Sequence, residues 1–158
     1  MKIKIMIYII ILLGISLVAG CTTNNSTGNT VLDSKNPAQA IIYKSSSCSC
    51  CGGFAKYIEK NDLTVEIKNV RNPHDIKDEY NIPSDLRSCH TTIIGDYFVE
   101  GHIPIEAINK LMTEKPDIKG IAMSGMPIGS PGMPGRKTET FVITAVNKDE
   151  SRTEFMRI

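Results

Sequence analysis

Apolar residues recur along the chain in two patterns: short alternating or continuous runs, and runs with the spacing of one helix face. The first pattern predicts strands, which we expect at residues 40–43, 63–70, 91–94 and 97–99. The second predicts helices, which we expect around residues 54–58, 73–80 and 104–112. Asn72-Pro73 and Pro104 supply the cap and first-turn residues that open the last two helices.

The order strand-helix-strand-helix-strand-strand-helix is typical of the thioredoxin-like arrangement, an α/β fold with a four-stranded sheet and flanking helices. Residues 120–135 depart from it, because glycine and proline fill half of the segment, and such a composition predicts a loop. Residues 138–146 and 152–158 alternate again around a polar turn, which predicts a C-terminal β-hairpin. We therefore expect a thioredoxin-like domain over residues 38–158, with a Gly/Pro/Met loop and a terminal hairpin.

Residues 1–20 have the pattern of an export signal peptide. Lys2 and Lys4 precede an apolar run that ends in small residues before Cys21. This ending resembles the lipobox of prokaryotic lipoproteins, in which Cys21 becomes the lipidated first residue. An uncleaved membrane anchor is the alternative, although residues 5–19 are short for a span of roughly 20 residues. Both interpretations place the domain outside the cytoplasmic membrane. With the lipoprotein interpretation we expect it in the cell envelope, lipid-anchored at the outer face of the cytoplasmic membrane or in the periplasm.

The segment that follows and the charge of the chain limit the remaining possibilities. Residues 21–37 are polar and lack periodicity, which predicts a disordered tether. The formal net charge is +1, with basic and acidic residues interspersed. Because the chain has no basic run, we expect no nucleic acid partner.

Three cysteines lie within four residues, at Cys48, Cys50 and Cys51, between a predicted strand and a predicted helix. The free N–H groups and the dipole at a helix N-terminus stabilise a thiolate over a thiol. A thiolate is the nucleophile of disulfide exchange and also a soft ligand for Cu(I) or Zn(II). The segment therefore predicts either metal handling or thiol redox chemistry.

The spacing of these cysteines leaves several interpretations open. Cys48 and Cys51 have the Cys-x-x-Cys spacing of a redox motif at a strand-to-helix turn. Cys50 would compete for the mixed disulfide in such an exchanger, whereas adjacent thiolates in a metal cluster can bridge different ions. Structural disulfides are the usual state of exported cysteines, but a ring between neighbouring cysteines is strained. Structural zinc is disfavoured, because the paired cysteine sites typical of zinc proteins are absent.

Further candidate ligands lie later in the chain. Cys89 and His90 precede the third predicted strand, which begins beside the first cysteine segment in a thioredoxin-like fold. Cys89 would complete a four-sulfur site, pair with Cys48 or Cys51 as a disulfide, or be a buried small residue. His102 lies in the turn before the third helix, either as a ligand or as an ordinary surface or core histidine.

Methionines of the Gly/Pro loop are a second type of candidate ligand. Met123, Met126 and Met133 lie there, and thioethers select Cu(I), while a glycine-rich backbone can wrap closely over a site. The alternative is that these methionines fill gaps in the core. A catalytic triad is not indicated, because Ser88 and His90 have no identifiable acidic partner, and no glycine-rich phosphate loop follows a strand.

Four motifs together resemble one protein family. They are Tyr43-Lys44-Ser45 followed by Cys48-Ser49-Cys50-Cys51-Gly52, then Ser88-Cys89-His90-Thr91, then the segments 99–104 and 125–133. In this order they resemble the CopG-type copper-handling proteins of prokaryotic envelopes, thioredoxin-like proteins long described as a domain of unknown function or as predicted metal-binding proteins. The resemblance implies Cu(I) held as a cluster by the motif cysteines and nearby side chains, with a role in copper resistance. The resemblance covers roughly residues 40–135, so the lipobox and the tether lie outside it.

The sequence thus predicts a lipid-anchored, copper-binding envelope protein. Metal binding is favoured over enzyme activity, and thiol or copper redox activity stays open. It would store, transfer or convert copper, with a copper transporter or chaperone as partner. The expected ligands are Cys48, Cys50, Cys51, Cys89, His90, His102, Met126 and Met133. One alternative is a membrane-tethered thiol-disulfide oxidoreductase that uses Cys48 and Cys51. Another is a thiol protein for silver, mercury or arsenic, since soft ions share these ligands.

Overall fold

The computed structural model describes residues 39–158, so the predicted signal peptide, the tether and Cys21 lie outside it. The helices and strands are β1 (Gln39–Lys44), α2 (Ser49–Glu59), β2 (Thr64–Asn69), α3 (Pro73–Glu79), the 3-10 helix η1 (Ser84–Leu86), β3 (His90–Ile94), β4 (Tyr97–Glu100), α4 (Ile105–Glu114), β5 (Ile118–Ala122), β6 (Val142–Asn147) and β7 (Arg152–Arg157). Within these residues no helix has the length and apolar character needed to cross a membrane.

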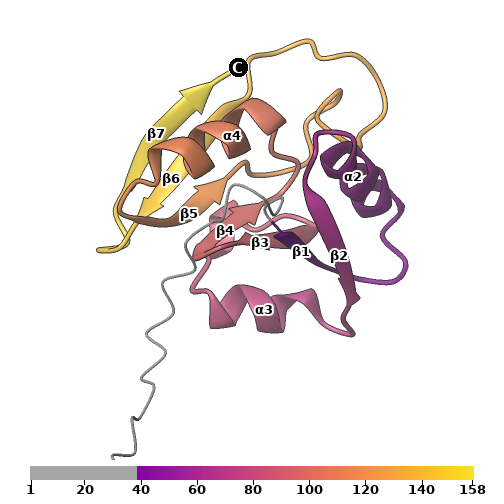
Figure 1. Cartoon of the computed structure of the whole chain (residues 1–158), viewed down its shortest axis with the longest axis horizontal. Coiled ribbons are helices and arrows are strands. Elements are labelled where there is room, and N and C mark those ends of the chain that lie inside the picture. The colour runs from indigo at the N-terminus through magenta and orange to yellow at the C-terminus, as the bar shows by residue number, and fades with distance from the viewer. Residues whose placement is uncertain (1–38) are drawn as a thin grey trace, which may run out of the picture. The chain divides into compact units, whose positions relative to one another are not determined.

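One mixed sheet contains all seven strands of residues 39–158, in the order β2-β1-β3-β4-β5-β6-β7 (Figure 1). β1 pairs in parallel with β2 and antiparallel with β3, and β4 pairs in parallel with β5. The α/β class and the predicted helices are confirmed, whereas the predicted sheet of four strands is too small. The difference arises because β5 pairs with both β4 and β6 and so joins the terminal hairpin to the sheet.

The loop predicted from residue 120 onward begins later, because residues 120–122 belong to β5. Gly120 lies opposite Phe98 of β4 and Val146 of β6. A Cβ atom at position 120 would lie 2.6 Å from Cγ of Phe98. Glycine is needed here for close packing within a strand, not for a turn. The loop itself, hereafter the β5–β6 loop, spans residues 123–141.

Helices cover both faces of the sheet and create two cores. On one face, α2 and α4 contribute Phe54, Ile58 and Leu111 to the larger core. On the other face α3 lies beside β1 and β3, near a smaller core around Phe98 (Figure 1). Burying each large apolar side chain contributes about 1.5–3 kcal/mol, so the two cores hold the strand ends in fixed positions.

Candidate metal centre

The strand pairing explains why motifs distant in the sequence meet at one edge of the sheet. Lys44, the last residue of β1, lies opposite His90, the first residue of β3. Thr91 of β3 in turn lies opposite Glu100, the last residue of β4, and Glu100 lies opposite the end of β5. The segments after β1, before β3, after β4 and after β5 therefore start or end at the same edge. These are the segments that carry the predicted ligands.

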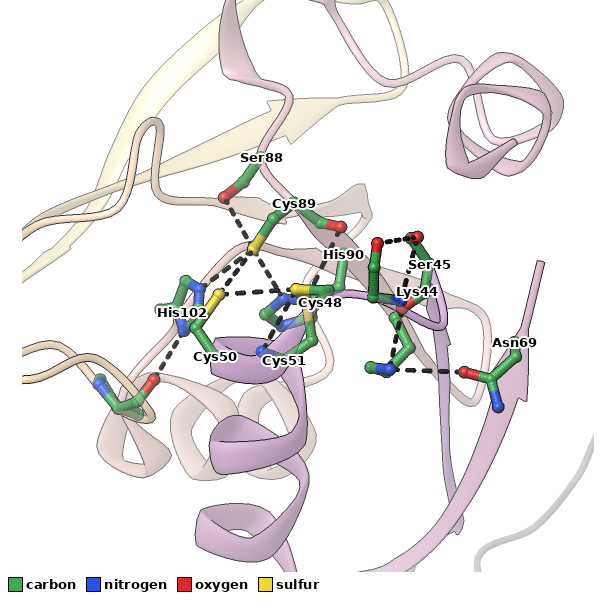
Figure 2. Close-up of a disulfide and its surroundings, with 12 residues drawn as sticks. Lys44, Ser45, Cys48, Cys50, Cys51, Asn69, Ser88, Cys89, His90 and His102 are labelled. Atoms are coloured by element: carbon green, nitrogen blue, oxygen red, sulfur yellow. Dashed lines mark hydrogen bonds between the residues drawn. A yellow bond between two sulfur atoms is a disulfide. The ribbon is translucent and has the colours of Figure 1, made fainter. Parts of the chain in front are cut away.

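The first cysteine motif forms the N-terminus of α2, as predicted. Cys48 is the N-cap, and its Sγ accepts a hydrogen bond from the Cys51 N–H at 3.3 Å. Cys51 is fully buried, whereas Cys48 and Cys50 are half-buried. Cys48 and Cys51 are joined by a disulfide, while Cys50 and Cys89 are free thiols (Figure 2). The alternative in which Cys89 pairs with Cys48 or Cys51 is therefore wrong.

The cysteines of the two motifs form one compact group. The Sγ atoms of Cys48, Cys50, Cys51 and Cys89 all lie within 4.8 Å of one another. Cys50 lies between the others, with its Sγ 3.5 Å from that of Cys48 and 3.9 Å from that of Cys89. The structure thus brings together four of the predicted ligands.

Two histidines extend this group from the Cys89 side. Nε2 of His102 lies 3.1 Å from Sγ of Cys89, and Nδ1 of His90 lies 3.4 Å from it. Nδ1 of His102 lies 2.7 Å from the carbonyl oxygen of Pro131, to which it donates a hydrogen bond. That bond leaves the lone pair on Nε2, directed toward Cys89. Both histidines are fully buried, which rules out the surface interpretation of His102.

The surroundings keep both imidazoles neutral. Burial lowers the pKa of His90 well below its usual range, and repulsion from the nearby His102 ring, when protonated, and from Lys77 lowers it further. Burial also lowers the pKa of His102, although the bond to Pro131 opposes the change. Neutral imidazole is the form that binds metals. Burial and the neighbouring Cys50 raise the pKa of Cys89 to about 11, so the metal-free centre carries a protonated thiol there.

The chemistry of these donors fits a soft metal ion. The Phe54 ring packs against both imidazoles, with centroid distances of 4.4 Å to His90 and 5.8 Å to His102, and shields them from water. Nε2 of His90 is buried without a hydrogen-bond partner among residues 39–158, a feature that an unaccounted ligand can explain. Several sulfurs beside neutral imidazoles suit Cu(I) and related soft ions.

The β5–β6 loop closes over the N-terminus of α2 through two glycines. Gly132 has a φ of +81°, and a Cβ atom there would lie 2.8 Å from the carbonyl oxygen of Cys50. Gly53 makes the matching approach from the helix, where a Cβ atom would lie 3.0 Å from the Gly132 oxygen. Only glycine allows backbones to come this close. The contact holds Pro131 where its carbonyl reaches His102.

The methionines of the loop have different environments. Met123 packs in the larger core, as the gap-filling interpretation expects. Met126 is 51% exposed, and Met133 is half-buried. The Ser88 hydroxyl donates a hydrogen bond to the Gly125 carbonyl at 2.9 Å, which places the start of the loop beside Cys89. A thioether ligand from Met126 or Met133 stays a prediction.

A buried ion pair beside the centre was not predicted from the sequence. Lys77 of α3 and Glu100 of β4 are both inaccessible to solvent and lie 2.6 Å apart, Nζ to Oε1. The sequence did point to Glu100, because this residue lies with His102 in the segment 99–104, one of the four motifs shared with the family. Lys77 lies in an amphipathic helix where a lysine normally faces water, so no local pattern reveals its burial.

Comparisons with known proteins agree with the motifs. Residues 86–133 match a family described as "Protein of unknown function, DUF411". A solved structure named "Copper resistance protein copG- Form 2" has a TM-score of 0.73 and 30% identity, and the match covers 78% of this chain and 99% of that chain. A second, "Copper resistance protein copG- Form 1", has a TM-score of 0.72 and 30% identity, with 78% and 98% covered. No curated protein matches the chain. The cysteine cluster and these relatives together suggest copper binding.

Proposed function

Because this chain belongs to the CopG-type family of copper-handling proteins, we propose that it holds Cu(I) through its cysteine and histidine cluster. The observation that carries the proposal is the grouping of four cysteine sulfurs within 4.8 Å of one another. Cys89 shares a second such group with His90 and His102. Thiolates prefer soft, monovalent copper over harder ions.

Each side chain then has a distinct role. Cys48 and Cys51 supply thiolates from the N-terminus of α2, where the helix dipole favours negative charge. Cys50, which lies between the sulfurs of Cys48 and Cys89, is placed to bridge two ions. His102 supplies Nε2, held in that tautomer by Pro131. Copper bound here would be the cargo of the protein and a centre capable of one-electron redox change.

The disulfide makes copper loading depend on the redox state. While it links Cys48 and Cys51, neither sulfur is available as a thiolate. Two electrons and two protons convert it to two thiols, and loading then releases the thiol protons. The copper-competent form is therefore the reduced one, which requires an external thiol reductant, and the disulfide form holds no copper through Cys48 and Cys51.

We further propose that the domain works in the cell envelope, anchored by a lipid on Cys21. A tether over residues 21–37 would leave the cluster free to meet a copper transporter or chaperone. Met126 and Met133, from the loop beside Cys89, would assist in capturing or retaining Cu(I). Storage, transfer and redox conversion of copper are all compatible with this arrangement, and copper resistance is its expected outcome.

A competition experiment tests the metal preference. The full chain, reduced under anaerobic conditions, is offered equal amounts of Cu(I) and Zn(II) together with a chelator of moderate affinity. We expect retained copper and little zinc, because thiolate donors outnumber harder donors. Stoichiometric zinc without copper would contradict the proposal.

A thiol-disulfide oxidoreductase is the second candidate function, and the disulfide between Cys48 and Cys51 favours it. Cys48, half-buried at the helix N-terminus, would attack a substrate, and the buried Cys51 would resolve the mixed disulfide. Cys50 has no role in this reaction, and its sulfur 3.5 Å from that of Cys48 makes it a competitor. Strong reduction of insulin disulfides, unchanged or improved by Cys50→Ser, would favour this function over copper binding.

A further inference from the structure

The buried pair of Lys77 and Glu100 lies where apolar side chains would be expected. Lys77 is 1% exposed and Glu100 is 0% exposed. Removing two charges from water is costly, and apolar residues of similar size often replace such pairs without loss of stability. General stability is therefore a weak reason for the pair, and its hydrogen bonds indicate a more specific role.

These hydrogen bonds join the pair to Ser88 and Thr91, the residues on either side of Cys89 and His90. Oε1 of Glu100 accepts a hydrogen bond from the backbone N–H of Ser88, and Oε2 accepts one from the Thr91 hydroxyl at 2.6 Å. Nζ of Lys77 donates to the Thr91 oxygen at 2.9 Å. One carboxylate thus holds the residue before Cys89 and the residue after His90.

The same carboxylate belongs to the strand that leads to His102. Glu100 ends β4, and the chain turns at Gly101, whose φ is +84°. A Cβ atom at Gly101 would lie 3.1 Å from that of Ser88, so the turn packs directly on the anchored segment. Glu100 therefore ties the position of Cys89 to that of His102, the two ligands whose donor atoms lie 3.1 Å apart.

Side chains alternate between the two faces of a strand, which separates this anchor from the metal ligands. His90 points toward Phe54 on the α2 face, and Thr91 points toward Lys77 on the α3 face. Glu100 is in neither of the groups of potential metal donors that residues 39–158 form, both of its oxygens accept hydrogen bonds from other residues, and the Lys77 ammonium group has no lone pair to offer. Neither residue is therefore a ligand.

We propose that Glu100 and Lys77 are positioning residues of the metal centre. Glu100 clamps the Cys89–His90 segment onto the strand that carries His102, and Lys77 supplies the opposite charge that lets the carboxylate remain buried. The inference rests on the proposed copper function for its consequence, but the clamp itself can be tested without metal.

Two double variants of the full chain separate the clamp from the charge. Lys77→Met/Glu100→Gln and Lys77→Met/Glu100→Leu both remove the ion pair, and their side chains are similar in size. Only the glutamine variant keeps polar atoms for both anchors, because its amide oxygen can accept from the Ser88 N–H and its NH2 group can donate to the Thr91 hydroxyl oxygen. We expect Cu(I) affinity near that of wild type in the glutamine variant. In the leucine variant it should fall about 10- to 100-fold, the usual effect of losing an outer-shell partner.

A structural role alone would change stability without changing the centre, so two further readouts are needed. The Co(II)-loaded chain reports the thiolate and imidazole donors in its absorption bands, which should shift only in the leucine variant. The rate at which iodoacetamide alkylates Cys89 in the metal-free chain should rise in the same variant. Ile143→Val, a change in the larger core on β6, two strands away from β4 in the sheet, controls for general destabilisation and should leave both readouts unchanged.

The outcomes decide between the explanations. Equal Cu(I) affinity and equal alkylation in both double variants would overturn the clamp. If wild type retains no Cu(I), the proposed function fails, and the alkylation rates still test the positioning. Should the leucine variant not fold, Thr91→Val in the wild-type background removes one anchor while keeping the ion pair. Unchanged alkylation of Cys89 in that variant would overturn the inference.

Discussion

Replacing Gly132 by alanine tests whether the β5–β6 loop controls the metal centre. Gly132 lies against the first turn of α2, and its neighbour Pro131 accepts the hydrogen bond from His102. An added methyl group would come closest to the backbone nitrogen of Phe54 and would lie 2.8 Å from the Cys50 carbonyl oxygen. Since both partners are backbone atoms, neither can swing aside as a side chain would.

Two separate costs follow from this geometry. A residue with a Cβ in the left-handed region costs about 1–2 kcal/mol, and Gly132 has a φ of +81°. Forcing extra atoms into a packed contact costs about 1–3 kcal/mol more. Lifting the loop sacrifices the Pro131–His102 hydrogen bond, worth about 0.5–1.5 kcal/mol. Lifting is therefore the smaller cost, and we expect a detached loop in a folded protein.

Gly125→Ala is a matched control. Gly125 lies in the same loop with a φ of +73°, but no heavy atom lies within 4 Å of the position its Cβ would take. Gly125→Ala therefore has the cost of a Cβ in the left-handed region but not the cost of a steric overlap. Chelator competition on the reduced chain should show a loss of Cu(I) affinity of about 10- to 100-fold for Gly132→Ala, because His102 loses the partner that orients it. Gly125→Ala should remain near wild type.

Limited proteolysis supplies the second measurement of the same pair. Cleavage within the β5–β6 loop should be faster in Gly132→Ala than in Gly125→Ala, while thermal unfolding of the two differs little. Equal Cu(I) affinity and equal cleavage would refute the idea that loop seating orients His102.

Three further results are expected. Cys50→Ser should lower the copper bound per chain to about one ion, since serine removes the soft bridging donor; an unchanged copper content, measured by metal analysis, would argue against a bridge. Oxidation with diamide should lower the copper capacity and dithiothreitol should restore it, because Cys48 and Cys51 leave the ligand set as a disulfide; equal copper in both states would show that these sulfurs do not bind it. Cys21→Ala should release the chain from membranes or block its processing, and a processed variant that still pellets with membranes would rule out the lipid anchor.

Sequence patterns predict the local parts of this protein well. The helix start at Asn72-Pro73 is confirmed, with Asn72 Oδ1 accepting from the His74 N–H at 3.2 Å. The cysteines at the N-terminus of α2 are confirmed too, since Cys48 caps the helix. Both features depend on residues only a few positions apart, which a single stretch of sequence contains.

The features that sequence patterns missed depend on residues far apart in the chain. From the sequence alone Gly120 predicts a loop, and only its pairing with Phe98 of β4 shows that it belongs to a strand. The tautomer of His102 depends on Pro131, and the burial of Lys77 in α3 depends on Glu100 of β4, 23 positions later in the chain. No local pattern records these pairings, and the Cys-x-x-Cys spacing alone allowed both a disulfide and a metal cluster.

The most direct test of the central claim is the metal content of the full chain together with the protection of its thiols. The chain is reduced, loaded with Cu(I) and separated from free metal under anaerobic conditions, and alkylation of Cys48, Cys50, Cys51 and Cys89 is followed by peptide mass. We expect more than one copper ion per chain and all four cysteines protected, because they lie within 4.8 Å of one another as a common ligand set. Less than one ion per chain, with all four cysteines still alkylated, would contradict the account.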